Sequence, residues 1–171
     1  NGNWNKNKPG LIISFDAGYE SNYKYAKPVL EKYGFKGWFF IPSGLIRKGK
    51  SKEKSNTEKE YMNWEQIRDL HKNHIIGCHT LTHKRLKEEL DEETLKKEIY
   101  HSKIILEKEL NDEVDIFCWV GGEKESYPKK ASDIIKKSEY KYSFLCLFPV
   151  YSKCPPCNNI ESCKDTILLR G

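Results

Sequence analysis

The sequence predicts an α/β fold built on parallel strands, and two observations lead to this class. Short apolar runs alternate along the chain with segments of helical periodicity. Strands separated by helices pair in parallel through right-handed crossovers. No glycine-rich phosphate loop follows the first run, so a dinucleotide-binding fold has no support. An open doubly wound sheet and a (β/α) barrel both fit this pattern, and both place chemistry at the carboxyl ends of the strands.

Five apolar runs are predicted strands, and a sixth run is a weaker candidate. The runs are short, rich in β-branched and aromatic residues, and flanked by turn-forming residues. The predicted strands are Leu11–Phe15, Gly37–Ile41, Ile75–Cys78, Ile116–Val120, Tyr142–Phe148 and, as the weaker candidate, Thr166–Leu169.

Apolar residues that recur every three or four positions predict the helices between these strands. Gly34 is placed to cap the first helix, and Asn63 with Gln66 forms a capping-box pattern at the start of the second. The predicted helices are Tyr23–Tyr33, a segment from Asn63 to about Asn73, Asp91–Leu110, and Pro128–Ser138.

Length and composition indicate one soluble domain over residues 1–171, with a polar tail at 1–8 and a charged surface loop at 47–60. No apolar run approaches the length of about 20 residues that a membrane helix needs. The net charge is +5, but Lys and Glu alternate along the helices, so nucleic acid is not an expected partner. Residues 1–8 lack the apolar centre of a secretory signal, which leaves the compartment open, and nothing indicates the oligomeric state.

The cysteines fall into two groups. Cys78 and Cys118 lie in predicted strands, where a free thiol acts as a small hydrophobic group. Cys154, Cys157 and Cys163 are compatible with a zinc site, a disulfide or free thiols, and these alternatives stay open.

The candidate site lies where three predicted strands end. Asp16 follows the first strand, His79 and His83 follow the third, and the loop Trp119–Glu123 follows the fourth. Two imidazoles and a carboxylate can hold a divalent metal that lowers the pKa of bound water and polarises a carbonyl, which suits amide or ester hydrolysis. A carboxylate that is not a ligand can then take the proton from the attacking water.

Each of these residues also has a plainer interpretation. Asp16 is placed to cap the next turn through its side chain, and Trp119 at a strand end is more often a core residue than a sugar-stacking platform. The backbone N–H groups of Gly121 and Gly122 are candidate donors to an oxyanion. The remaining histidines are expected on the surface, namely His71, His74 and His101.

Three segments resemble motifs of the polysaccharide deacetylases, the NodB homology domain of carbohydrate esterase family 4. Ser14–Tyr19 (Ser-Phe-Asp-Ala-Gly-Tyr) is similar to the first motif, Thr-Phe-Asp-Asp-Gly. His79–His83, with the helix before it, resembles the second motif, His-Ser/Thr-x-x-His. Phe117–Glu123 is similar to the third motif more loosely. The segments occur in the order of the family, and the resemblance spans roughly Leu11 to Arg170.

The resemblance implies a distorted (β/α) barrel of the NodB type, and a shortened form without the C-terminal elements stays open. It implies a metal, most often zinc, held by the second aspartate of the first motif and by the two histidines of the second, here His79 and His83. Asp16 would be the general base. The implied activity is hydrolysis of N-acetyl or O-acetyl groups on a carbohydrate by metal-activated water, which is hydrolase chemistry on carbon–nitrogen bonds other than peptide bonds. Glu123 and the residues Trp119, Gly121 and Gly122 would contact the acetylated amino sugar or polysaccharide.

The chain departs from the family pattern in three places. Ala17 stands where the family has its metal aspartate, and a methyl group cannot coordinate a cation. Asp16 acting as the ligand, replacement by Glu20 or Glu123, a weak or absent metal, and an engineered change all stay open. The third motif has Cys118, Val120 and Gly121 where the family has an Arg and a Pro-Tyr pair. No histidine follows His101 to supply the late general acid.

Three hypotheses follow, and the first two are close in rank. The first is a metal-dependent carbohydrate deacetylase. The second is a relative of the deacetylases that keeps the fold, binds carbohydrate and is catalytically impaired or inactive. The third, a basic nucleic-acid module, rests on charge alone and would show a steep salt dependence of binding.

Overall fold

The computed structural model describes residues 12–47, 60–121 and 127–145. Within them, all neighbouring strands pair in parallel in the order β1-β2-β3-β4-β5. This order settles the choice between the two architectures, because a doubly wound sheet reverses its order from the first strand whereas a barrel adds strands consecutively. The sheet is therefore the curled half of a (β/α) barrel. Its strands are β1 (Ile13–Phe15), β2 (Gly37–Ile41), β3 (Ile75–Cys78), β4 (Ile116–Cys118) and β5 (Tyr142–Phe144).

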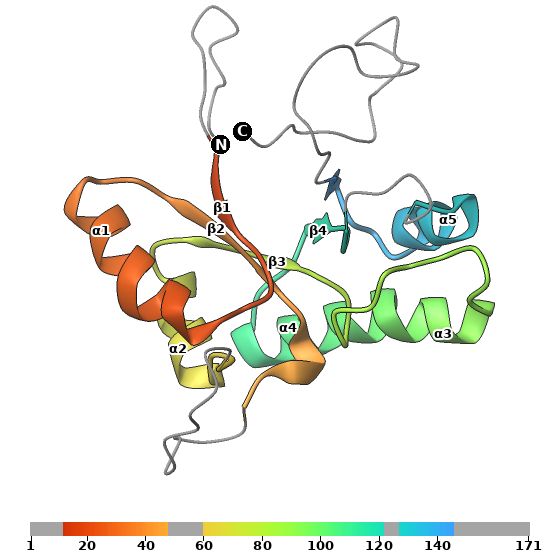
Figure 1. Ribbon diagram of the computed structural model, residues 1–171, viewed down its shortest axis with the longest axis horizontal. Helices are drawn as coiled ribbons and strands as arrows, with labels where there is room; N and C mark the ends of the chain where they lie inside the picture. Colours follow the sequence, from red (N-terminus) through yellow and green to blue (C-terminus); the bar gives the residue numbers. More distant parts are fainter. Residues whose placement is uncertain (1–11, 48–59, 122–126, 146–171) are drawn as a thin grey trace, which may run out of the picture.

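Helices follow the strands in turn, and in Figure 1 α1, α2, α4 and α5 succeed one another from left to right around the sheet. A π-helical turn, η3, joins α3 and α4 into one long helix along the bottom of that view. The helical segments are η1 (Asn22–Ala26), α1 (Lys27–Lys32), η2 (Ser43–Leu45), α2 (Trp64–His71), α3 (Glu92–Lys96), η3 (Lys97–His101), α4 (Ser102–Leu110) and α5 (Lys129–Lys137).

The predicted elements agree with the structure within a few residues where both can be compared. The bounds of β2 and β3 are as predicted, and the Asn63–Gln66 capping box is present. The fourth strand ends at Cys118 instead of Val120, because the chain turns towards Gly121, which has a φ of 93°. Pro128 is the N-cap of α5, with an extended ψ of 146°, and does not begin the helix. Most of the predicted loop 47–60 and the predicted strand Thr166–Leu169 lie outside the described residues.

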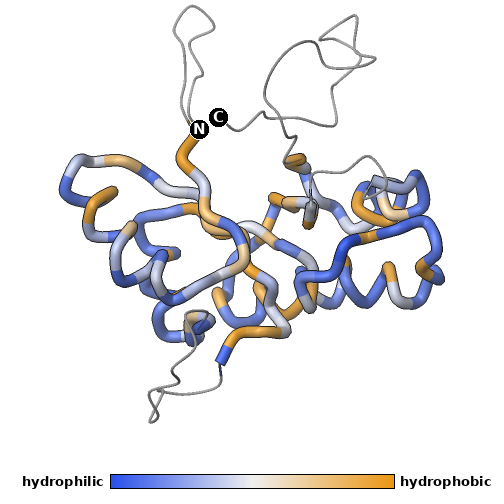
Figure 2. The backbone as a smooth tube through the Cα atoms, viewed as in Figure 1, coloured by the Kyte–Doolittle hydropathy of each residue, from blue (hydrophilic) through white to orange (hydrophobic). Residues whose placement is uncertain are grey.

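Both faces of the sheet are apolar, as a barrel requires. Strand side chains alternate between the two faces, so Phe39 and Ile41 join the large core beneath the helices while Phe40 packs on the opposite face with Phe144. Figure 2 shows hydrophobic stretches where the strands lie and hydrophilic stretches along the helices and loops around them. Cys78 and Cys118 are buried free thiols on opposite faces, which confirms their expected role as small hydrophobic groups.

His74 does not lie on the surface, and the sequence-based expectation for it was wrong. Its side chain is fully buried, its Nδ1 accepts a hydrogen bond from Gly37 N at 3.1 Å, and its ring lies edge-on to Phe39. Burial lowers the pKa of His74 below its usual value. The neutral imidazole thus connects the starts of β2 and β3. His101 is exposed, as expected, and His71 is half-buried beside Asp112.

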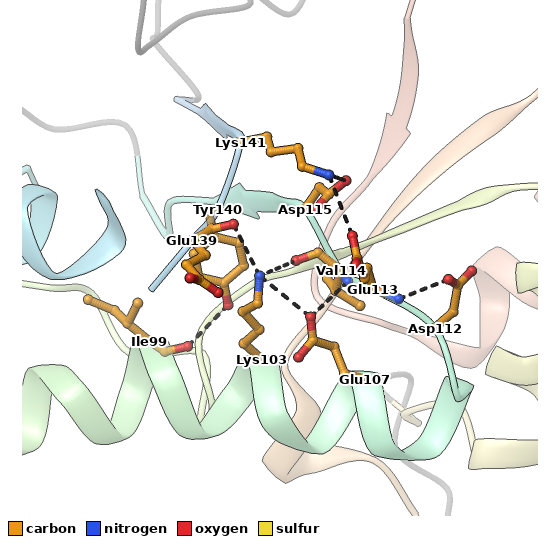
Figure 3. Close-up of polar contacts among 10 residues, drawn as sticks. All are labelled: Ile99, Lys103, Glu107, Asp112, Glu113, Val114, Asp115, Glu139, Tyr140 and Lys141. Carbon is orange, nitrogen blue, oxygen red and sulfur yellow. Dashed lines mark hydrogen bonds and ion pairs between the residues drawn. The ribbon is translucent and has the colours of Figure 1, made fainter. Parts of the chain in front are cut away.

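A buried lysine connects three elements at the amino ends of β4 and β5 (Figure 3). Lys103 Nζ donates to the carbonyl oxygens of Val114, at 3.1 Å, and Glu139, at 3.2 Å. It lies 3.5 Å from Glu107 Oε1 and 4.7 Å from the centroid of the Tyr140 ring. Lys103 is only 8% exposed, so these contacts replace the water that its charge would otherwise bind. We call this set of five residues the Lys103 cluster.

Candidate functional site

The loop after β1 places Asp16 at the carboxyl end of the sheet. Ala17 and Gly18 both have left-handed backbone, with φ of 66° and 64°, so the chain reverses immediately after Asp16. The loop is fixed to a neighbouring segment by hydrogen bonds from Met62 N to Gly18 O (2.9 Å) and from Glu20 N to Glu60 O (2.7 Å). Asp16 is half-buried at the rim of the sheet, in the position from which a base could reach a substrate.

The loop after β3 carries the two imidazoles and returns sharply on itself. Thr80 and His83 have left-handed φ values of 63° and 60°. Thr80 Oγ1 accepts from Lys84 N at 3.1 Å, and Leu81 O accepts from Gly44 N at 2.7 Å. These bonds close the turn, and they bring His83 back beside His79.

The geometry of the two imidazoles fits a shared cation. Their ring centroids are 4.9 Å apart and their planes meet at 61°. Two imidazoles bound to one zinc ion at about 2.1 Å in tetrahedral geometry would have centroids roughly 5 Å apart. His79 Nδ1 lies 2.8 Å from Cys118 O, so Nδ1–H donates to that carbonyl and the lone pair resides on Nε2. The spacing of the rings is compatible with two ligands of one metal ion, and that role stays a prediction.

Asp16 lies at the same edge of the sheet as the two histidines, because it follows β1 and they follow β3 in a parallel sheet. Burial lowers the pKa of His83, and the negative charge of Asp16 opposes this effect. The three residues therefore follow strand ends at one edge of the sheet, and their convergence on one metal stays a prediction.

The third protein ligand of a complete metal site is missing from the described residues. Ala17 is buried beside Asp16 and offers only a methyl group. Glu20 is committed elsewhere: its burial acts to raise its pKa, but hydrogen bonds from Lys24 and Gln66 overcome this and lower the pKa to about 2. Arg47 Nη2 binds the same carboxylate at 2.9 Å. Within residues 12–47, 60–121 and 127–145, no three His, Cys, Asp or Glu side chains form a metal-holding group.

The loop after β4 is described only at its two ends. Trp119 is 3% exposed and lies edge-on to Phe117 and Tyr127, so its indole faces are occupied by protein. Its Nε1 is buried and has no hydrogen-bond partner within the described part of the chain. Gly121 O accepts from Tyr127 Oη at 3.2 Å. Gly122 and Glu123 lie outside the described residues, and the substrate-binding role of the four residues stays a prediction.

One residue behind the site was missed in the sequence. Glu98 is 4% exposed, and its carboxylate accepts hydrogen bonds from the loop between His79 and His83. The available signal was its position, since Glu98 lies between Leu95 and Ser102 on the inward face of an amphipathic helix. A carboxylate on such a face is buried only when it has partners.

The fold and the site together place the chain among the (β/α)-barrel proteins of the NodB type. The sequence profile of polysaccharide deacetylases matches residues 3–143, so the chain belongs to the polysaccharide deacetylase family. A curated relative, the putative polysaccharide deacetylase YxkH of Bacillus subtilis (strain 168), is 35% identical over 77 residues, covering 44% of this chain and 24% of that protein.

Two solved structures have the same fold at low sequence identity. Streptococcus pyogenes deacetylase PplD, solved in complex with acetate, has a TM-score of 0.66 and 21% identity, covering 78% of this chain and 54% of that one. IcaB from Ammonifex degensii has a TM-score of 0.68 and 20% identity, covering 81% and 61%. This chain therefore spans about a quarter of the curated relative and little more than half of these structures. Within the described residues, no helix combines the length and apolar character of a membrane span.

Proposed function

We propose that this chain carries residues of a carbohydrate deacetylase site that removes acetyl groups from an N-acetylated or O-acetylated sugar. The observation that supports the proposal is that Asp16 follows β1 while the paired rings of His79 and His83 follow β3, at the same edge of the parallel sheet. Membership of the polysaccharide deacetylase family supports acetylated carbohydrate as the substrate class.

The residues present have separate roles in this proposal. His79 and His83 would hold a divalent metal such as zinc, which when bound supplies Lewis-acid polarisation of the acetyl carbonyl and a water of lowered pKa. Asp16 would remove the proton from the attacking water as the general base. The Gly121 N–H is a candidate donor to the developing oxyanion.

Ala17 supports a second candidate function. With two imidazoles and no third protein ligand among the described residues, a metal would be held less firmly than in a three-ligand site. A chain with this site could bind the acetylated polymer without hydrolysing it. The two candidates therefore share a ligand and differ in turnover.

Release of acetate from N-acetylated oligosaccharides, measured with and without added Zn²⁺, separates the candidates. Hydrolysis that requires the metal and falls at least about 100-fold in His79→Ala and Asp16→Asn would support the deacetylase. His101→Ala is the matched control, because this exposed histidine lies outside the site. Saturable binding of the oligosaccharide with no acetate release, at any metal concentration, would instead support the non-catalytic relative.

A further inference from the structure

The loop that carries the two imidazoles has a conformation that its own sequence does not favour. Thr80 and His83 are not glycine, yet both occupy the left-handed region. Thr80 is also β-branched, which makes this region particularly unfavourable for it. Such a conformation persists only when surrounding groups determine it.

Glu98, on the turn η3, supplies three of the hydrogen bonds that hold this loop. Its Oε2 accepts hydrogen bonds from the backbone N–H groups of Leu81, at 3.0 Å, and Thr82, at 2.9 Å. Its Oε1 accepts from Thr82 Oγ1 at 2.7 Å. One buried carboxylate thus binds three donors within the segment that separates His79 from His83, and charge-assisted hydrogen bonds of this kind are strong.

The same helix binds the loop a second time. Ser102, four residues after Glu98, donates from Oγ to Thr80 O at 2.9 Å. The helix between them is π-helical from Lys97 to His101, a local widening that often accompanies functional sites. All three residues between the imidazoles are therefore held from behind by one helical face.

We propose that Glu98 is a positioning residue, whose carboxylate fixes the loop so that the rings of His79 and His83 face one another at the spacing of two metal ligands. Glu98 binds the backbone N–H groups of Leu81 and Thr82 and the Thr82 hydroxyl, so it acts on the rings through the loop between them. The expected effect of Glu98 on cation binding rests on the proposed function. Its effect on the arrangement of the two rings does not, and can be tested without a metal.

Co²⁺ titration of the full chain, followed by visible absorption, measures the consequence. Glu98→Ala removes all three acceptor bonds and is expected to weaken Co²⁺ binding about 10- to 100-fold, as loss of an outer hydrogen-bond partner does at other metal sites. Glu98→Gln is expected to remain within about threefold of the native chain, because the amide oxygen can still accept from both N–H groups. Glu107→Ala is the matched control. Glu107 lies on the same long helix and binds Val114 N at 3.1 Å, so this variant should lose stability without changing Co²⁺ affinity.

Long-range ¹H–¹⁵N spectra of the imidazoles measure the geometry without metal. In the native chain His79 should be the Nδ1–H tautomer, fixed by Cys118 O, and His83 should give a single sharp signal set. In Glu98→Ala the signals of both rings should broaden or average, whereas those of His74, buried at the other end of β3, should not move. His74 thus serves as the internal reference for folding.

The two measurements separate the failure of this inference from the failure of the proposed function. A native chain that binds no Co²⁺, with averaged rings in Glu98→Ala, overturns the metal role and supports positioning. Unchanged ring signals and unchanged Co²⁺ affinity in a folded Glu98→Ala variant overturn positioning. If Glu98→Ala does not fold, Thr82→Val removes a single bond from the exposed side of the loop. A shift of about threefold in the same direction then supports the inference, and no shift overturns it.

Discussion

Polar side chains are used differently at the two ends of the strands. In the Lys103 cluster, at the amino ends of β4 and β5, the lysine is paired with Glu107 and with two backbone carbonyls. At the carboxyl ends of β1 and β3, the polar groups are held from behind, His79 by Cys118 O and its loop by Glu98. One end uses charge to join elements, and the other uses hydrogen bonds to hold the imidazole loop in a fixed conformation. This difference predicts that stability and ligand binding can be altered separately.

Removing the buried charge should have the largest effect. Lys103→Met leaves the carbonyls of Val114 and Glu139 without their donor, and we expect a loss of about 3 kcal/mol in the free energy of unfolding, measured with urea. Co²⁺ affinity at the imidazoles should not change. Lys141→Met, in the same region but exposed, should alter stability little. Equal losses in the two variants would show that burial of the charge at Lys103 is not what matters.

Supplying the missing ligand tests the opposite end. Ala17→Asp should strengthen Co²⁺ or Zn²⁺ binding about 100-fold, equivalent to about 2.7 kcal/mol, because a third protein ligand completes a catalytic-type site. Aspartate also tolerates the left-handed backbone at this position better than alanine does. Ala17→Asn, similar in shape but neutral, is the control and should gain much less. An equal gain in both variants would mean that the carboxylate charge at position 17 does not reach the metal.

Protonation of His74 should produce a smaller, pH-dependent effect. The folded chain lowers the pKa of this histidine from 6.5, so below pH 6.5 the unfolded state binds more protons and stability falls with falling pH. Between pH 7 and pH 5 we expect the unfolding free energy to fall as the pH falls, with the slope of one proton, about 1.4 kcal/mol per pH unit, as its upper bound. His74→Gln keeps an acceptor for Gly37 N–H and should flatten this slope, leaving the contribution of His83. An unchanged slope would assign the pH dependence to other groups.

Relieving strain at the structural end should have the smallest effect. Glu139 has a left-handed φ of 59°, and its contact with Lys103 uses only the backbone carbonyl. Glu139→Gly should therefore stabilise the chain by about 0.5–1 kcal/mol in thermal or urea unfolding.

The same replacement at the other end, Thr80→Gly, should instead lower Co²⁺ affinity, because it removes the Oγ1 that accepts from Lys84 N. If Thr80→Gly raised stability as much as Glu139→Gly does and left Co²⁺ affinity unchanged, the proposed difference between the two ends would be wrong.

The sequence predicted the fold class and most strands because their signals are local. The runs that became β2 and β3 are bounded by Gly or Pro or by polar residues, and the carboxyl end of a parallel strand is where Asp16, His79 and His83 had to lie. The π-helical turns were not predictable, since one additional residue per turn leaves no clear mark on periodicity. The partners of His74 and Glu98 were not predictable either. Gly37 precedes His74 by 37 residues and Leu81 precedes Glu98 by 17, so these contacts depend on how strands and helices pack.

One long helix, α3–η3–α4, carries a glutamate that contacts each end of the sheet, and this fixes the spacing between the two glutamates. Glu98 binds the imidazole loop and Glu107 pairs with Lys103, nine residues or about 13 Å further along the α3–η3–α4 axis. Each residue added or removed between them would rotate one glutamate by about 100° relative to the other. The spacing therefore sets the relative angle of the two glutamates: an insertion or deletion between Glu98 and Glu107 would detach either the imidazole loop or the lysine, even if the remaining helix stayed intact.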